Sequence, residues 1–222
     1  MDHPIIEYFT LHTIQGRDRY RPPSPPDVSS RSSPDIPSAF NANLFPLMHR
    51  VTALHFHSRQ EPTISSSTIC EAVELWSQLD GLTLPDEDLP APEYQTLHQL
   101  HVSALFIWLH CITHPDNIAN QKVQDMLADG LARMATLDCS SPDAASLLVI
   151  PLFLHGVASV RSPHRDAINQ YFTRLDNTMS NPTLQTYQTI VQWIWSRHDS
   201  RIHRSWDWTD WEDAGLTWRG PD

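Results

Sequence analysis

Glycine is scarce in this chain, whose 222 residues contain six glycines against eighteen prolines. These glycines lie too far apart to form a G-x-G-x-x-G loop or a P-loop, in which closely spaced glycines let the backbone approach a phosphate. We therefore do not expect a nucleotide-binding enzyme of the usual kinds. The sequence also lacks the G-x-S-x-G turn that exposes a serine nucleophile.

Cysteine is almost as rare, with three residues, Cys70, Cys111 and Cys139, spread over the chain. This number and spacing favour neither a disulfide framework nor a C-x-x-C metal site. All three lie in or beside helical patterns, where a thiol usually acts as a small buried hydrophobe. We expect reduced thiols in an intracellular compartment.

Long apolar runs and basic runs are missing as well. The opening MDHPIIEYFT has no secretory pattern, and the longest apolar runs, residues 104–109 and 147–154, are far shorter than the roughly 20 residues of a spanning helix. The formal net charge is −11, and the longest basic run is the mixed segment at residues 17–21. Because nucleic acid would be repelled by such a chain, we expect neither membrane insertion nor direct DNA binding.

Composition divides the chain into two parts. Residues 21–38, RPPSPPDVSSRSSPDIPS, are rich in proline and serine and too poor in apolar side chains to repay the entropy of ordering. We predict a disordered N-terminal segment over residues 1–39, with a short docking segment near Ile5 to Leu11 as its one apolar feature. Residues 40–222 then form a single folded domain.

Helical periodicity runs through that second part. Apolar residues recur at helical spacing over residues 44–59, 65–79, 92–113 and 118–137, and Gly81 marks the end of the second of these helices. Three later starts, Ser141-Pro142, Ser162-Pro163 and Asn181-Pro182, each place a capping residue before a proline at the first helical position. No segment alternates with period two. We predict an all-α domain of about seven or eight antiparallel helices.

The helix that follows Ser141 contains the apolar run of residues 147–154 and, within it, Pro151. Proline removes one backbone hydrogen bond and clashes with the preceding turn, so we predict that this helix kinks or restarts there. Gly156 should let a neighbouring helix approach closely.

The histidines offer one spacing that suits a metal, His110-x-x-x-His114. No glutamate accompanies this pair, and His114 precedes a proline that should end the helix. We therefore interpret the histidines as structural and assign no catalytic, metal-binding or cofactor-binding residue. Four others are expected on helix surfaces or at the edge of the core: His55, His57, His98 and His101.

Near the C-terminus, the sequence WDWTDWEDAGLTW interleaves tryptophans with acidic residues. A separate acidic cluster, at residues 86–88, lies in a predicted loop far from this tail in the sequence and should be solvated. The tail could be an exposed acidic-aromatic segment of the transcriptional activation type, or its tryptophans could pack on the domain. We favour the second interpretation, in which the tryptophans pack on the domain. The tryptophans are Trp206, Trp208, Trp211 and Trp218, and the acidic residues between them are Asp207, Asp210, Glu212 and Asp213.

Over residues 40–218, the chain resembles the C-terminal regulatory domain of fungal-specific transcription factors of the zinc binuclear cluster type. The resemblance is a diffuse set of positions rather than one motif. They are Pro151-Leu152-Phe153, Gly156, Arg165, Ile168, the aliphatic run to Trp195, Arg197-x-Asp199 and Trp206-Asp207-Trp208, with residues 71–76 and Ile107-Trp108-Leu109-His110 upstream.

This resemblance implies a nuclear transcription regulator without catalytic activity or cofactors. Family members usually begin with six closely spaced cysteines that bind two zinc ions, and this sequence lacks them. It is therefore expected either to be a truncated product, with residues 21–38 as the remnant of a linker, or to act through partners. Those partners are a second copy, another transcription factor or a coactivator, with a small-molecule effector as a further candidate. Fungal genes, for example a secondary-metabolism cluster, are the implied targets.

An alternative from another class is a small helical enzyme or ligand carrier with a site between its helices. The motivation is the histidine-rich stretch of residues 94–114, which includes His98, His101 and His110.

Overall fold

A computed structural model describes residues 38–82, 92–140, 142–179 and 182–213. These residues form seven helices of 14 to 22 residues and one short final helix, and they contain no strand. The prediction of an all-α domain is confirmed. The predicted disordered segment falls almost wholly outside the described residues. The helices are α2 (Ser38–Arg59), α3 (Ser66–Asp80), α4 (Pro92–Thr113), α5 (Gln121–Met134), α6 (Pro142–Val157), α7 (Ser162–Met179), α8 (Pro182–Asp199) and α9 (Asp210–Asp213).

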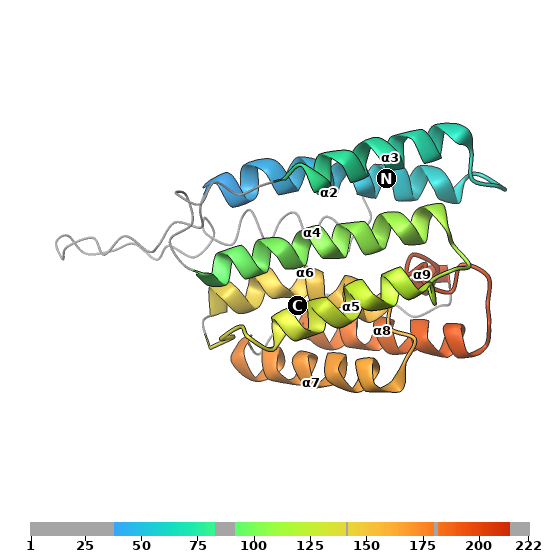
Figure 1. The fold of residues 1–222 in the computed structure, drawn as a ribbon. Helices are drawn as coiled ribbons and strands as arrows, with labels where there is room; N and C mark the ends of the chain where they lie inside the picture. The colour runs from blue at the N-terminus through green and yellow to red at the C-terminus, as the bar shows by residue number, and fades with distance from the viewer. Residues whose placement is uncertain (1–37, 83–91, 141, 180–181, 214–222) are drawn as a thin grey trace, which may run out of the picture.

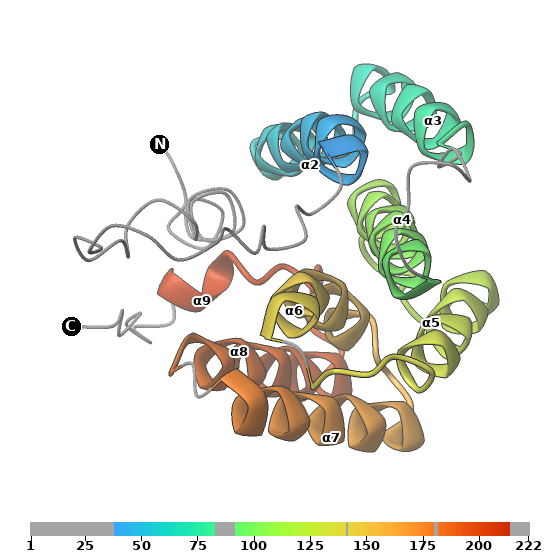
Figure 2. The ribbon, with the colours of Figure 1, turned by 90° about the vertical axis from the view of Figure 1, so that its left-hand side faces the viewer.

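Successive long helices run antiparallel, with their axes roughly aligned (Figure 1). The α2–α3 hairpin lies on one side and the α7–α8 hairpin on the other, with α4 and α6 between them (Figure 2). The most extensive contact in the bundle is between α4 and α6. None of the helices in the described ranges is long and apolar enough to span a membrane.

Helix α6 is the centre of the core. Every residue from 150 to 159 is buried, including Leu152, Phe153 and Leu154. A helix that is apolar all round must be surrounded by other elements, and α6 contacts α4, α7 and α8. The apolar run seen in the sequence is therefore the inner helix of the bundle.

Helix starts agree well with the sequence patterns. Helices α4, α6 and α8 begin at the predicted prolines, although the capping residues before α6 and α8 lie outside the described residues. The Ser65 side chain caps α3 by accepting a hydrogen bond from the backbone N–H of Thr68 (3.2 Å). Two starts differ by a few residues. Helix α5 begins after Asn120, whose side chain accepts from the Lys122 N–H (2.9 Å), and Ser162 is the first residue of α7 rather than its cap.

Pro151 and Gly156 behave differently from one another. Helix α6 continues through Pro151 to Val157, so the predicted restart does not occur. The predicted close approach at Gly156 is confirmed. A Cβ atom there would lie 3.1 Å from Val191 Cγ1, and the Trp195 indole N–H donates to the Gly156 carbonyl (2.9 Å).

Several histidines belong to the core rather than to the surface. The prediction was wrong for His55, His98 and His101, which are at most 5% exposed, whereas His57 is exposed as expected. The neutral imidazole is stable there because Nδ1 of His101 bonds the Leu97 carbonyl (2.8 Å). Burial lowers the pKa of His101 to about 4.

His155 repeats this arrangement on α6 and adds a packing constraint. Its Nδ1 bonds the Pro151 carbonyl (2.7 Å), and burial lowers its pKa to about 4. Its Nε2 atom points at α5, where a Cβ atom on Gly130 would lie 2.2 Å away. The imidazole is fully buried and tied to Pro151, so it cannot swing aside. Only glycine fits at position 130.

We predict that Gly130→Ala destabilises the fold, although this change in an exposed helix usually stabilises by about 1 kcal/mol. Overpacking against His155 should cost about 1–3 kcal/mol. Urea unfolding of the variant and the parent measures the difference. In a His155→Ala background the clash is gone, so Gly130→Ala should become neutral or stabilising. A destabilisation of the same size in both backgrounds would contradict the explanation.

The buried imidazoles also predict a pH dependence. Because His101 and His155 have folded pKa values of about 4 against 6.5 for the unfolded chain, their contribution is complete above pH 6.5 and is lost as the pH falls toward 4. Each should lower the free energy of unfolding by about 1.4 kcal/mol per pH unit in that window. Urea unfolding at several pH values between 7.5 and 5 measures the slope. His101→Gln should reduce it, and replacing the exposed His49 with glutamine should not.

Candidate functional site

After α8 the chain turns back over the bundle as a segment of residues 200–213, here called the strap. Trp206, Trp208 and Trp211 of the strap are only 2%, 1% and 6% exposed. The favoured interpretation of the tryptophan-rich tail as packing residues is therefore confirmed for these three, and Trp218 lies outside the described residues. The strap is part of the core rather than a free tail.

The strap tryptophans meet aromatic rings from three helices. Trp208 lies against His55 of α2 (ring centroids 4.9 Å apart), Trp108 of α4 (5.1 Å) and Phe153 of α6 (5.3 Å). Trp206 contacts His55 from another side at 4.9 Å. This aromatic cluster joins the N-terminal hairpin, the central helices and the strap.

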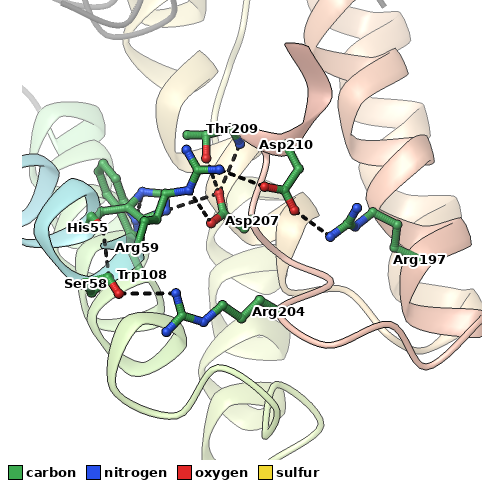
Figure 3. A network of polar contacts seen from close by, with 9 residues as sticks. All are labelled: His55, Ser58, Arg59, Trp108, Arg197, Arg204, Asp207, Thr209 and Asp210. Carbon is green, nitrogen blue, oxygen red and sulfur yellow. Dashed lines mark hydrogen bonds and ion pairs between the residues drawn. The ribbon is translucent and has the colours of Figure 1, made fainter. Parts of the chain in front are cut away.

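Asp207, between these two tryptophans, is a buried carboxylate with 3% of its side chain exposed. Arg59 Nε lies 3.0 Å from its Oδ2 atom, and the Thr209 N–H donates to Oδ1 at 3.1 Å (Figure 3). Burial alone would raise the pKa of Asp207, but the contacts with His55, Thr209 and Arg59 outweigh it and hold the pKa well below its usual range. Asp207 is therefore ionised inside the protein.

The His55 imidazole links the carboxylate to the aromatic cluster. Its Nδ1 accepts a hydrogen bond from the Trp108 indole N–H (3.3 Å), so the ring proton is on Nε2. That Nε2 atom lies 3.3 Å from Asp207 Oδ1, within ion-pair distance but without hydrogen-bond alignment. A histidine beside an aspartate suits general-base chemistry. Here, however, the two side chains are 0% and 3% exposed, so the pair is enclosed by protein.

A second carboxylate extends the contacts to α8. Asp210 accepts hydrogen bonds from Arg59 (2.8 Å) and from Arg197 (2.7 Å), which come from opposite sides of the bundle (Figure 3). Arg204 of the strap donates to the Ser58 carbonyl (3.2 Å) at the end of α2. We call His55, Arg59, Arg197, Asp207 and Asp210 the Asp207 network.

The other candidates of the sequence analysis do not meet at this network. His110 and His114 do lie together, with stacked rings 4.7 Å apart. In the described ranges, no group of three histidine, cysteine, aspartate or glutamate side chains could hold a metal ion. Burial raises the pKa of the Cys111 thiol to about 12. The expectation of burial was wrong for Cys70, which is exposed.

A cleft of about 550 Å³ opens at the end of the bundle where the strap begins. Neither His98, His101 nor His110 belongs to its lining. It is lined by Pro115, Asp116, Ile118, Ala119, Val160, Arg165, His198, Asp199, Arg201, Ile202, His203 and Ser205.

Sequence reasoning missed the partners of Asp207. It noted the Trp206-Asp207-Trp208 triplet and Arg197-x-Asp199, but it did not single out Arg59 and placed His55 on a helix surface or at the edge of the core. An aspartate between two tryptophans that are expected to pack inward is the available signal, because a buried charge requires a partner. The spacing in the sequence does not say which cation supplies it.

Comparison with known families gives one match. The sequence model described as the fungal specific transcription factor domain matches residues 5–218. The match includes the strap and the Asp207 network, and it begins within the predicted N-terminal segment. No curated protein and no solved structure matches the chain.

We predict that Asp207→Asn destabilises the protein by about 1–3 kcal/mol, because the buried contact with Arg59 is lost while Arg59 keeps its ion pair with Asp210. Asparagine can still accept from Thr209 through its amide oxygen, but its NH2 group then faces Arg59, so the variant removes the charge and the acceptor for Arg59 together. The matched control is Asp199→Asn, since the Asp199 side chain is 64% exposed in its ion pair with Arg165. That change should cost no more than about 1 kcal/mol. Equal losses in the two variants, measured by urea unfolding, would refute the role of the buried charge.

Proposed function

We propose that this chain, which belongs to the fungal specific transcription factor domain family and is therefore a transcription-regulator-like protein, works in the nucleus through protein contacts. The observation that carries the proposal is the extent of the match, residues 5–218 of 222. The residues that hold the fold together, from α2 to the strap, lie within the matched region. Fungal genes, with a secondary-metabolism cluster as the first candidate, are the proposed targets.

A regulatory rather than catalytic role is supported by the state of the most chemically suggestive residues. The His55–Asp207 pair is enclosed and its groups are used for structure. The thiol of Cys111 is buried and protonated at neutral pH. The alternative of a helical enzyme or carrier keeps one supporting observation, the cleft, although the histidines that motivated it are elsewhere.

The net charge of −11 supports action through proteins rather than direct contact with DNA. In the described part of the chain, three large apolar side chains are exposed: Ile69 (45%), Val73 (52%) and Ile202 (45%). Ile69 and Val73 are one turn apart on α3, and the half-buried Trp76 continues their stripe. Helix α3 lies at the outer edge of the bundle (Figure 2).

A second copy of the chain is the occupant that we propose for this stripe. Two chains of net charge −11 repel each other unless the contact avoids acidic groups. On α3, Glu71 and Glu74 lie on the edge opposite to the stripe, where Arg50 approaches them at 3.9 and 3.2 Å. The Ile69–Val73 turn therefore offers apolar contact away from these two glutamates, and the acidic residue in line with the stripe, Asp80, lies at the far end of the helix.

The test combines solution and cellular measurements. We expect the parent chain to be dimeric by analytical ultracentrifugation, and Ile69→Glu/Val73→Glu to be monomeric and equally stable, because each copy then brings two charges to the contact. The matched control is Ala128→Glu/Ala132→Glu, which adds the same charges at the same spacing on the exposed side of α5. In cells, deletion of the locus should change the transcript levels of its target genes. Expression of the control variant should restore these levels, and expression of the α3 variant should not.

Two results would count against the proposal at different levels. If the parent chain is monomeric, a second copy of the chain is excluded as the partner of the α3 stripe, and a different protein is left as the partner. Unchanged transcript levels after deletion of the locus would remove the regulatory function itself.

A further inference from the structure

The cleft lies where several chain connections meet. The α4–α5 loop, the α6–α7 loop and the exit of α8 into the strap are all at the same end of the bundle (Figure 1). They contribute Asp116 and Ile118, Val160, and Ile202, respectively. The cleft is therefore bounded on one side by the strap, the same segment that carries Asp207.

One wall of the cleft is apolar. Ile118 is buried, Val160 is half-buried, and Pro115 and Ala119 complete the surface. Ile202 faces the same space with 45% of its surface exposed. Binding sites for small molecules are commonly of this kind, with apolar walls, a few polar groups and volumes of about 300–1,000 Å³.

The backbone holds Ile202 in this exposed position. Arg201 and Arg204, on either side of it, have φ angles of 54° and 49°, in the left-handed region that disfavours side-chain-bearing residues. Backbone hydrogen bonds fix the turn, from the Ile202 N–H to the Arg197 carbonyl (3.1 Å) and from the Arg201 N–H to the His198 carbonyl (3.0 Å). These two bonds are the usual pattern of a helix C-terminus with a left-handed residue after it, so the end of α8 fixes the position of Ile202.

The cleft lining contains two arginines, and they differ in their partners among the described residues. Arg165 forms a two-pronged ion pair with Asp199 (2.8 and 2.9 Å), and His203 Nδ1 lies 2.7 Å from Asp116. His198 donates from Nε2 to the Val157 carbonyl (3.0 Å), and burial lowers its pKa, so it is neutral at pH 7. Arg201 has no carboxylate partner among the described residues. The cleft thus holds one arginine without a carboxylate partner beside an apolar wall.

We propose that this cleft binds a small organic acid, with the carboxylate of the ligand on Arg201 and its apolar body against Ile202, Val160 and Ile118. A single arginine without a carboxylate partner and an apolar wall select a monocarboxylate with an aromatic ring or a medium-length alkyl chain. The binding site itself does not depend on the proposed transcriptional function.

The position of the cleft would let such a ligand influence the rest of the fold, and this regulatory use does rest on the proposed function. Ser205 lines the cleft and is bonded to His198, and the next residue along the chain is the buried Trp206. A ligand that binds only the ordered strap stabilises the folded chain by mass action. Ligand binding would therefore stabilise the arrangement in which the Asp207 network holds the strap against the bundle.

The experiment uses the full chain and two probes, 3-phenylpropionate and octanoate, each paired with its uncharged alcohol, 3-phenylpropan-1-ol and 1-octanol. Calorimetric titration and thermal unfolding are the readouts. We expect both acids to bind and to raise the midpoint of unfolding, and the alcohols to bind about two- to fivefold more weakly, the effect of one exposed ion pair.

Two variants locate the site. Arg201→Asn removes the cation and retains a residue that tolerates left-handed backbone, so it should abolish the preference for acid over alcohol. Ile202→Ser should weaken the binding of the acids and of the alcohols alike. The control is Arg174→Gln, an exposed arginine on α7 that does not line the cleft, and it should bind as the parent does.

The inference is overturned if neither acid saturates the parent chain at about 10 mM, a concentration well above a weak millimolar Kd. It is also overturned if Arg201→Asn keeps the full preference for acids over alcohols while folding normally. Because these measurements use purified chain, a failure of the transcriptional proposal in cells would leave them unaffected.

Discussion

The charge of Asp207 has to be neutralised inside the protein, because an unpaired carboxylate in an apolar interior costs several kcal/mol. Its partners, His55 and Arg59, are on α2, at the opposite end of the chain from the strap. Asp210 then connects Arg59 to Arg197 of α8. The requirement of one buried anion thus joins the first described helix, the last long helix and the C-terminal segment, while aromatic rings fill the space around it.

Local features of the fold followed from the sequence, whereas long-range pairing did not. Helical periodicity and the prolines at positions 92, 142 and 182 act within a few residues, so these helices and their starts could be predicted. The partners of Asp207 could not, since Arg59 and Asp207 are 148 positions apart and nothing in the spacing links them. The burial of His98 and His101 was also missed, because their polarity favoured the surface. The carbonyl that satisfies His101 belongs to Leu97 of its own helix.

The cleft and the Asp207 network share the strap, and this shared element gives the proposed functions a common structural basis. Ile202 and Ser205 face the cleft, and Trp206 to Thr209 lie in the core immediately after them. A ligand bound at one end of the strap and the ion pairs at the other end would therefore favour the same arrangement, in which the strap is packed on the bundle. Helix α3, with its apolar stripe, is connected to this arrangement through α2, which carries His55 and Arg59.

The long separation between the ends of the Asp207 network also sets an order of events during translation. Arg59 and Asp207 are 148 positions apart in the numbering. At about 5–20 residues per second, the ribosome needs roughly 7–30 s to make the intervening chain. During this time α2 exists without the strap, and its face that carries His55 and Arg59 is open. The fold can therefore close only after Trp206, Trp208 and Trp211 have been made.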